Sequence, residues 1–404
     1  MFLDLNSYFA SVEQQVHPEW RGKPVAVGPA GTDSGTVIAA SYEAKAFGVK
    51  TGTKVGEAKR MCPGLIFADS THSLYTHYHH RVLEAVETVL PVDRVCSIDE
   101  MQFRLLGSEA TPEAARALAL RLKAAIREHA GEVLSCSVGI APNGFLAKMG
   151  TELEKPDGLV VIEAKDLPHI LHRLQLMEFT GINRRMFARL NAAGIFTAEQ
   201  MCAASRTHLV RAFGSILGER WWYLLRGYDL PHEETKTRSL GHSHVLPPKL
   251  RSEEGCRDVL LRLIQKASSR LRASGLRAGT MDVSVRGIAK SWREHMRFTP
   301  TADTVLFNEL FLDAWGRRDF ERPLQVGVVF GALKKAEAVT PSLFDNAVQR
   351  GELNSAVDTI NQRYGKNTVF LAGIRGTKDA APERIAFQKT ELFKEGAGDN
   401  EWED

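Results

Sequence analysis

The sequence has few cysteines, and none of them are paired along the chain. Five thiols are scattered over 404 residues: Cys62, Cys96, Cys136, Cys202 and Cys256. A structural zinc site needs close pairs such as CxxC, and a disulfide framework needs a dense, even set in a short chain. The absence of both patterns argues against both classes and favours a reducing, cytoplasmic setting.

The sequence also lacks the long apolar runs of a membrane protein. No window approaches the roughly 18 uninterrupted apolar residues of a spanning helix. The chain begins Met1-Phe2-Leu3-Asp4. A carboxylate at that place does not fit a secretory signal, which needs a basic start and then an apolar stretch. We therefore expect no membrane partner.

A strong net charge is absent as well, but the charges are unevenly distributed. The formal net charge is +3, yet residues 236–335 hold 19 Lys and Arg against 10 Asp and Glu. Residues 336–404 hold 8 basic against 12 acidic residues, and residues 1–235 hold 25 basic against 27 acidic residues. The basic block suits a module that binds a polyanion, although a solvated basic surface would give the same count.

Internal repeats are absent, and the chain is too long for one ordinary core, so we expect several domains. Strand and helix patterns alternate through residue 162, with single strands predicted over Arg94–Leu105 and Leu134–Ile140. From Asp166 to Leu230 the pattern is helical, with turns at Gly181, Gly194, Gly214, Gly218 and Gly227. Further on, an amphipathic helix and alternating strands indicate a separate basic α+β domain, followed by an acidic, partly disordered tail.

Acidic residues interrupt two of the predicted apolar strands. Asp4 ends the first, and Asp99 and Glu100 lie in the Val95–Met101 segment. Most Asp-Glu pairs face solvent, but charge inside an apolar strand is costly unless cations compensate it. Mg²⁺ prefers oxygen ligands, and two such ions can activate an attacking 3′-hydroxyl and stabilise a leaving pyrophosphate. The three acids therefore predict a centre for nucleotidyl transfer.

Several motifs resemble, in order and spacing, those of the Y-family (translesion) DNA polymerases. They are Leu3-Asp4-Leu5-Asn6-Ser7-Tyr8-Phe9-Ala10-Ser11-Val12-Glu13, Tyr42-Glu43-Ala44-Lys45-Ala46-Phe47-Gly48-Val49, Ser97-Ile98-Asp99-Glu100, Ser137-Val138-Gly139-Ile140-Ala141, Phe145-Leu146-Ala147-Lys148 and Lys155-Pro156-Asp157-Gly158. The resemblance is close over about the first 160 residues and looser beyond them. Lys155-Pro156 is similar to bacterial DNA polymerase IV, whereas Asn6 and residues 354–369 are similar to the catalytic subunit of DNA polymerase V.

The resemblance implies an α+β multidomain fold of the right-hand polymerase type. It has a palm of mixed sheet plus helices, small fingers, a helical thumb and a separate α+β little finger domain. The expected boundaries are residues 1–7 and 74–164 for the palm, 8–73 for the fingers, 165–232 for a thumb with a helix-hairpin-helix, 233–243 for a linker, 244–335 for the little finger and 336–404 for the C-terminal tail.

The resemblance also implies roles for single residues. Asp4, Asp99 and the backbone carbonyl of Leu5 would bind the metal under the triphosphate, and Glu100 would join the two aspartates at the catalytic metal. Residues expected at the nucleotide are Ser7, Tyr8 and Phe9, through N–H groups at a helix start, and Tyr42, Lys45 and Lys155. A packed aromatic is the alternative for Tyr42, and a solvated lysine for Lys45.

Three further residues modify this picture. Phe9 matches the steric gate, the aromatic that blocks a ribose 2′-hydroxyl, and it would also serve as a core residue of the first helix. Asn6 stands where many members have Asp, and we exclude it as a fourth acid. Ala39 stands where a small hydroxyl residue is common, so one triphosphate contact is expected to be missing.

Contacts with DNA and with a clamp are expected outside the palm sheet. The segment Phe179–Asn183 resembles a degenerate helix-hairpin-helix, whose turn exposes N–H groups to a phosphate without reading sequence. The residues predicted to contact DNA are Lys148, Gly181, Asn183, Arg238, Arg286, Lys290 and Arg293. Thr340–Asp345 resembles a weak β-clamp-binding peptide, with Ser342, Leu343 and Phe344 as its anchors.

These expectations describe a low-fidelity polymerase without proofreading. It would use two Mg²⁺ ions, for which Mn²⁺ could substitute, and would act on primer–template DNA and deoxynucleoside triphosphates in the cytoplasm, at the nucleoid. A sliding β-clamp and accessory mutagenesis proteins are the further expected partners. Two alternatives stay open: a nucleotide cyclase, whose palm also carries an acidic pair, and a catalytically silent DNA-binding adaptor.

Overall fold

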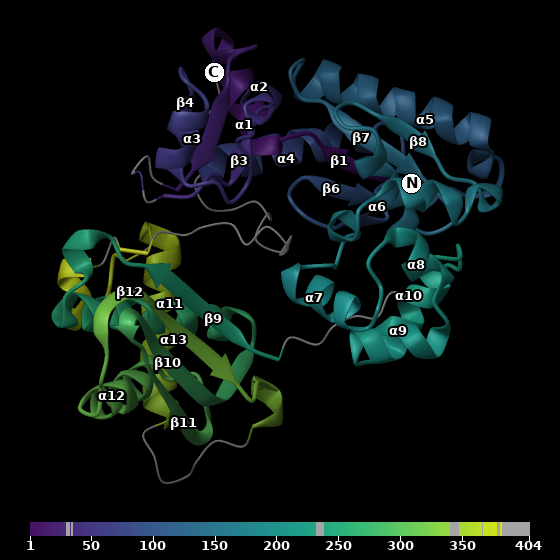
Figure 1. Cartoon of the computed structure of the whole chain (residues 1–404). Helices are drawn as coiled ribbons and strands as arrows, with labels where there is room; N and C mark the ends of the chain where they lie inside the picture. The colour runs from purple at the N-terminus through teal and green to yellow at the C-terminus, as the bar shows by residue number, and fades with distance from the viewer. Residues whose placement is uncertain are drawn as a thin grey trace. The chain divides into compact units, whose positions relative to one another are not determined.

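The computed structural model describes residues 1–29, 33, 35–231, 238–339, 347–365, 367–377 and 380–381 (Figure 1). They form two compact units, one within residues 1–231 and one within residues 238–381. Their mixture of sheets and helices agrees with the predicted α+β multidomain class. Among the described helices, none is long and apolar enough to cross a membrane.

The centre of the first unit is a five-stranded mixed sheet in the order β5-β6-β1-β7-β8. Its strands are β1 (Phe2–Leu5), β5 (Arg94–Val95), β6 (Glu100–Gln102), β7 (Cys136–Ile140) and β8 (Leu159–Val161). The central strand β1 is antiparallel to both neighbours, which places Asp4 opposite Glu100 and Ser137. Leu3 and Leu5 point into the buried core, so Asp4, between them, points to the other face.

Helices cover both faces of this sheet. The core on one face is completed by α4 (His72–Glu87) and α5 (Pro112–Ala125), and α6 (Gly144–Leu153) lies on the other. Asn143 starts α6 by accepting a hydrogen bond from the Leu146 N–H at 2.8 Å. This cap fixes where the helix begins, and so which of its residues face β1.

The close approach of α6 to the sheet depends on Gly139 of β7. A Cβ atom there would lie 1.9 Å from the Ala147 carbonyl oxygen and 2.9 Å from the Thr151 nitrogen. Both atoms belong to the α6 backbone, so the clash could be relieved only by moving the helix off the sheet. The sequence Ser137-Val138-Gly139-Ile140 therefore needs glycine for packing.

Gly139→Ala is expected to destabilise the first unit by about 3 kcal/mol, because overpacking against backbone cannot be absorbed by rotamers. Thermal unfolding followed by circular dichroism would measure it. Gly64→Ala serves as the comparison, since no atom lies within 4 Å of its added Cβ and only its φ of +87° is unfavourable. An equal loss in the two variants would contradict the close-packing account.

A small three-stranded sheet and the helix α1 (Tyr8–Val16) follow β1 and precede α4. The strands are β2 (Val25–Gly28), β3 (Ala39–Ala40) and β4 (Ile66–Asp69), in the order β3-β2-β4, with the helices α2 (Tyr42–Ala46) and α3 (Val55–Met61). Ser41 caps α2 through its hydroxyl, as Ser-Tyr-Glu-Ala suggests. Some buried residues here form a separate small core, whereas those of α1, together with Val27 and Ala68, belong to the core of the central sheet.

Short helices make up the last part of the first unit: α7 (Arg184–Ala192), α8 (Ala198–Ala203), α9 (Arg206–Phe213) and α10 (Leu217–Leu224). Their core surrounds Trp221 and includes Leu146 and Met149 of α6. The prediction of a turn at Gly218 is wrong, because this residue lies inside α10. A Cβ there would meet the Leu209 carbonyl oxygen at 2.3 Å, so Gly218 allows α9 and α10 to pack closely.

The second unit is a four-stranded antiparallel sheet in the order β11-β10-β12-β9. Its elements are β9 (Leu240–Val245), α11 (Glu253–Ala273), β10 (Leu276–Lys290), β11 (Trp292–Thr301), α12 (Thr304–Trp315) and β12 (Glu321–Gly331), and the short β13 (Lys334–Lys335) pairs with β10. Apolar residues alternate on β10 and pack with α11 and α12 on one face. The other face carries mainly polar and charged residues, with Val245 and Val329 exposed among them.

The structure differs from the sequence expectations at both ends of this unit. The strand β9 begins at Leu240, inside the segment predicted as a linker. Past Lys335, where partial disorder was predicted, α13 (Ala347–Tyr364) and a 3₁₀ helix at Ala372–Thr377 are formed. The Asp358 carboxylate of α13 accepts hydrogen bonds from Arg272 Nε and Nη2 on α11, at 2.6 and 2.9 Å.

Candidate active site

Two adjacent strands of the central sheet bring the three predicted acids near one another. Asp4 of β1 and Glu100 of β6 are directly paired residues. The Leu5 N–H donates to the Asp99 carbonyl at 2.9 Å, which ties the next position of β1 to the same segment. Residues far apart in the sequence thus meet because the two strands are antiparallel neighbours.

The position of Asp99 corrects the prediction of one strand over Arg94–Leu105. The segment folds back on itself, and Asp99 lies in the turn between β5 and β6. The Cys96 N–H donates to the Glu100 carbonyl at 2.8 Å and closes this turn. Ser97 Oγ donates to Asp99 Oδ1 at 2.5 Å. The acidic pair is therefore displayed on a hairpin end rather than along a strand.

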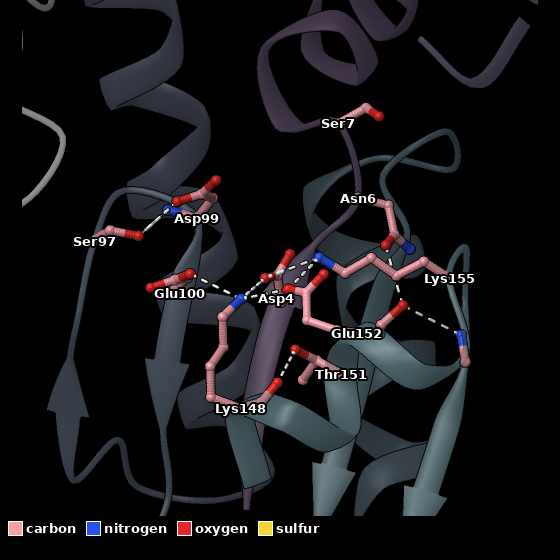
Figure 2. A network of polar contacts seen from close by, with 12 residues as sticks. Asp4, Asn6, Ser7, Ser97, Asp99, Glu100, Lys148, Thr151, Glu152 and Lys155 are labelled. Carbon is pink, nitrogen blue, oxygen red and sulfur yellow. Dashed lines mark hydrogen bonds and ion pairs between the residues drawn. The ribbon is translucent and has the colours of Figure 1, made fainter. Parts of the chain in front are cut away.

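Two lysines fill the space beside these carboxylates (Figure 2). The Lys148 ammonium of α6 pairs with Asp4 and lies 2.9 Å from Glu100 Oε1. The Lys155 ammonium lies 3.2 Å from Asp4 Oδ2. Lys148 was predicted to contact DNA, but its side chain is only 11% exposed and engaged by acids. This placement argues against a DNA contact and assigns Lys148 to the acidic cluster.

Burial and crowding of acids raise the pKa of Asp99 to about 6. Desolvation is the main cause, and Asp4 and Glu100 add to it, while the Ser97 hydrogen bond and Lys148 oppose it. For Lys148, burial alone would lower the pKa, but the neighbouring carboxylates raise it well above its usual range. Several carboxylates are thus crowded at a largely buried site, where a cation would be stabilised.

The donor set fits a hard divalent cation, although the carboxylates do not form a closed cage in this conformation. Within the described ranges, no three His, Cys, Asp or Glu side chains are arranged to hold a metal ion. The Lys148 ammonium lies between Asp4 and Glu100 as a positively charged stand-in. Carboxylate oxygens on adjacent strand ends are the ligands that Mg²⁺ prefers.

Asn6 is turned away from the acids and is committed to β7. Its side chain is buried, its Nδ2 donates to Ser135 Oγ at 3.2 Å, and its Oδ1 accepts from Ser137 Oγ at 3.1 Å. These bonds use both ends of the amide. The exclusion of Asn6 as a fourth acid is consistent with this geometry.

The start of α1 adjoins the cluster. Ser7 precedes the helix with a φ of 50°, and its hydroxyl accepts a hydrogen bond from Lys45 Nζ at 2.7 Å. The same ammonium lies 4.2 Å from the centre of the Tyr42 ring. Burial, with smaller effects from Asp4 and Glu152, raises the pKa of Tyr42 to about 12, so its hydroxyl stays protonated.

Phe9 is a core residue, as one of its two predicted roles requires. It is 7% exposed and stacks on Tyr75 of α4, with ring centres 4.3 Å apart. Tyr75 is held in turn by a 2.6 Å hydrogen bond to buried Glu13, and Tyr8 donates to the Tyr75 carbonyl at 2.7 Å. The ring of Phe9 therefore has a rigid backing on α4.

The turn that carries Lys155 is anchored by residues that the sequence analysis did not identify. Lys123, a buried residue of α5, donates to Asp157 Oδ1 at 2.9 Å and also contacts its carbonyl oxygen. Arg127 contacts the other carboxylate oxygen at 2.5 Å. In the sequence, the one sign of this arrangement is that Lys123 and Arg127 are four residues apart, which lets two cationic side chains on a helix reach the same carboxylate.

Asp157→Asn is expected to cost about 2 kcal/mol of stability, because the buried Lys123 ammonium loses a charged acceptor. Asn tolerates the positive φ of 57° at this position, so the change isolates the charge. A lowered midpoint of thermal unfolding would show it. Asp166→Asn, in the 3₁₀ helix that follows β8, is the control, and a loss of the same size there would contradict the anchoring role.

The chain matches the models of one protein family in two regions. Residues 3–152 match the impB/mucB/samB family, and residues 237–343 match the C-terminal domain of the same family. DNA polymerase IV of Moorella thermoacetica is 33% identical over 382 residues, which cover 92% of this chain and 95% of that protein. The chain belongs to the Y family of DNA polymerases.

Further similarities agree with this membership. DNA polymerase IV 1 of Bacillus subtilis is 28% identical over 96% of this chain and 95% of its own length. A solved chimera of Y-family polymerases has the same fold, with a TM-score of 0.69 and 24% identity over 84% of this chain and 99% of its own. The insertion ternary complex of Dbh DNA polymerase matches with a TM-score of 0.54 and 26% identity over 82% and 97%.

The helices α7 to α10 lie within residues 165–232, for which a helical thumb was predicted. Gly181 has a φ of +100°, and Asn183 caps α7 by accepting from the Met186 N–H at 3.0 Å. The tight turn and the helix start that were predicted therefore occur. A shallow pocket runs along residues 177–183 and reaches Glu152 at the end of α6.

The predicted little finger residues lie on the second unit. Arg286 and Arg293 are on the open face of the sheet, and Arg293 is bonded to Asp282 at 2.9 Å. Lys290, at the end of β10, pairs with Asp319, and Arg238 is exposed just before β9. The predicted clamp-binding residues Ser342, Leu343 and Phe344 lie outside the described residues.

Proposed function

We propose that this Y-family member adds deoxynucleotides to a primer 3′-end by two-metal-ion nucleotidyl transfer. The observation that carries the proposal is the meeting of Asp4, Asp99 and Glu100 at the adjoining ends of β1 and β6, with two lysines as their countercharge. The three carboxylates and the Leu5 carbonyl would hold two Mg²⁺ ions, or Mn²⁺ in their place. Bound there, the ions would activate the 3′-hydroxyl and stabilise the leaving pyrophosphate.

The surrounding residues are suited to hold a triphosphate. Lys45 and Lys155 offer ammonium groups next to the α1 start, where the N–H groups of Ser7, Tyr8 and Phe9 are proposed to meet phosphate oxygens. Burial and the nearby Lys155 lower the pKa of Lys45, which an incoming phosphate anion would reverse. Tyr42, protonated, can donate a hydrogen bond to the same phosphates.

Phe9 is proposed as the gate that excludes ribonucleotides. Its stacking on Tyr75 leaves the ring little freedom to move aside. A sugar that carries an additional 2′-hydroxyl would then meet a fixed aromatic edge. This residue turns a general phosphoryl-transfer centre into one that prefers deoxyribonucleotides.

Duplex binding is proposed for the thumb and the little finger. The turn at Gly181 and the start of α7 offer backbone N–H groups to a phosphate, and Arg286 and Arg293 add positive charge on the open sheet face. A sliding clamp, reached through residues 340–345, and accessory mutagenesis proteins remain proposed partners on the sequence evidence alone.

DNA affinity is expected to fall steeply with salt, since each phosphate contact releases about one counterion. Arg286→Ala should lower the slope of log affinity against log salt by about one. Fluorescence anisotropy of a labelled primer–template would measure both slopes. Arg257→Ala, on the helical face of the same unit, is the matched control. If the salt dependence of DNA affinity is the same in Arg286→Ala and the wild type, Arg286 does not contact the DNA backbone.

A primer-extension assay separates the proposed activity from the two alternatives. The wild-type chain with Mg²⁺ is expected to extend a primer on both undamaged and damaged templates. Without nucleotides it should leave the primer 3′-end intact, because no proofreading activity is proposed. Release of a cyclic nucleotide would indicate the cyclase, and DNA binding without extension would indicate the silent adaptor.

A further inference from the structure

Glu152 is an acidic residue of α6 that lies between the two lysines beside Asp4. Its Oε1 is 2.9 Å from the Lys148 ammonium and 2.9 Å from the Lys155 ammonium (Figure 2). Lys148 and Glu152 are four residues apart, on adjacent turns of α6, and Lys155 follows just past the end of this helix, so the three side chains meet. The sequence motifs assign no role to this residue.

The same two ammonium groups contact the carboxylates proposed to hold cations. Lys148 pairs with Asp4 and Glu100, and Lys155 pairs with Asp4. A divalent cation that takes up those oxygens must compete with both lysines. The lysines cannot simply lose their partners, because the Lys148 side chain is only 11% exposed and an unpaired buried charge is costly.

Glu152 is an acceptor that both lysines already contact, and it is not among the proposed metal ligands. Burial would raise the pKa of Glu152, but Lys148 and Lys155 lower it, so the carboxylate is ionised near neutral pH. With Glu152 present, the ammonium groups can give up Asp4 and Glu100 and still keep a negative partner at hydrogen-bonding distance.

We propose that Glu152 is a positioning residue, which holds the Lys148 and Lys155 ammonium groups when divalent cations occupy Asp4 and Glu100. This inference rests on the proposed function. Without the Glu152 charge, the Lys148 and Lys155 ammonium groups would stay paired with the proposed metal ligands Asp4 and Glu100 and would compete with cation binding. Glu152 thereby sets the cation affinity of the site and keeps Lys155 where a triphosphate would bind.

Binding of Tb³⁺ to the full chain, without DNA or nucleotide, tests this directly. The ion is followed by its luminescence, sensitised by the nearby Tyr42. Glu152→Gln keeps the shape and an acceptor oxygen but removes the charge, and it is expected to weaken Tb³⁺ binding by about tenfold. Glu152→Asp should recover part of this loss. Glu154→Gln, an exposed neighbour on the same turn, should bind as the wild type does.

A double-mutant cycle separates this role from a merely structural one. Lys148→Met is expected to tighten Tb³⁺ binding, because it removes a competitor for Asp4 and Glu100. In that background Glu152→Gln should weaken Tb³⁺ binding by less than about threefold, since one of the two lysines through which Glu152 acts is gone and only Lys155 remains. Unchanged binding in Glu152→Gln, or an equal loss in both backgrounds, would overturn the inference.

One further variant separates failure of the inference from failure of the proposed function. Asp4→Asn should reduce Tb³⁺ binding if Asp4 is a metal ligand. If Asp4→Asn binds Tb³⁺ as tightly as the wild type, the proposed site itself is wrong. If Asp4→Asn weakens Tb³⁺ binding but Glu152→Gln does not, the proposed metal site is supported and the positioning role of Glu152 is wrong. Thermal unfolding of each variant shows whether it is folded.

Discussion

Replacing Asp99 and Glu100 together by alanine is expected to reduce primer extension by at least about 10³-fold. Both carboxylates lie at the β5–β6 hairpin end beside Asp4, and the nearby acid Glu152 is held by two lysines. Loss of the metal ligands would remove the activation of the nucleophile and the stabilisation of the leaving group together. Single-turnover incorporation of one nucleotide measures the loss.

The control for this variant removes two acids from the same part of the molecule. Glu84→Ala with Glu87→Ala changes two exposed residues of α4 and should leave incorporation near the wild-type rate. DNA binding by the Asp99 and Glu100 variant should persist, since the proposed duplex contacts lie elsewhere. Incorporation within a few-fold of the wild-type rate by that variant would exclude these carboxylates from catalysis.

Phe9→Ala is expected to lower the preference for deoxyribonucleotides over ribonucleotides by about a hundredfold. Steric exclusion of one additional hydroxyl from a filled pocket lowers kcat/KM by roughly a hundredfold. Phe9 is fixed because it stacks on Tyr75, which Glu13 holds by a hydrogen bond. The ratio of kcat/KM for a matched deoxyribonucleotide and ribonucleotide gives the preference directly.

Phe9→Tyr keeps the ring and should keep most of the discrimination. Some loss of stability is expected in Phe9→Ala, because the residue is also buried in the core of the central sheet. The ratio of the two kcat/KM values is insensitive to the fraction of folded enzyme. Sugar discrimination that is the same in Phe9→Ala and the wild type would refute the gate.

Helices that begin with a capping residue could be predicted from the sequence. Ser41 and Asn143 cap α2 and α6 with side-chain hydrogen bonds, so the starts of both helices follow from local chemistry. The resemblance predicted Asp4, Asp99 and Glu100 in one site, and the antiparallel pairing of β1 with β6 brings them near one another. The comparisons confirm the family, the fold class and the polymerase assignment.

Other features depend on contacts that no local pattern encodes. The turn at Cys96–Asp99 is closed by backbone hydrogen bonds and contains neither glycine nor proline, so the segment was predicted as one strand. The helix α13 is held by ion pairs such as Asp358 with Arg272, and its acidic surroundings predicted disorder instead. Lys148 was predicted to contact DNA because its acidic partners Asp4 and Glu100 are more than 40 residues away in the sequence. No local pattern shows that the fold brings them to this lysine.

Cation dependence of templated incorporation tests the central claim most directly. A primer–template is mixed with one complementary nucleotide and the wild-type chain, first in EDTA and then with rising Mg²⁺ or Mn²⁺. We predict no incorporation in EDTA, restoration by either cation, and addition of only one nucleotide where the template allows one. Incorporation that resists EDTA, or that proceeds equally well without a template, would contradict two-metal-ion templated transfer at Asp4, Asp99 and Glu100.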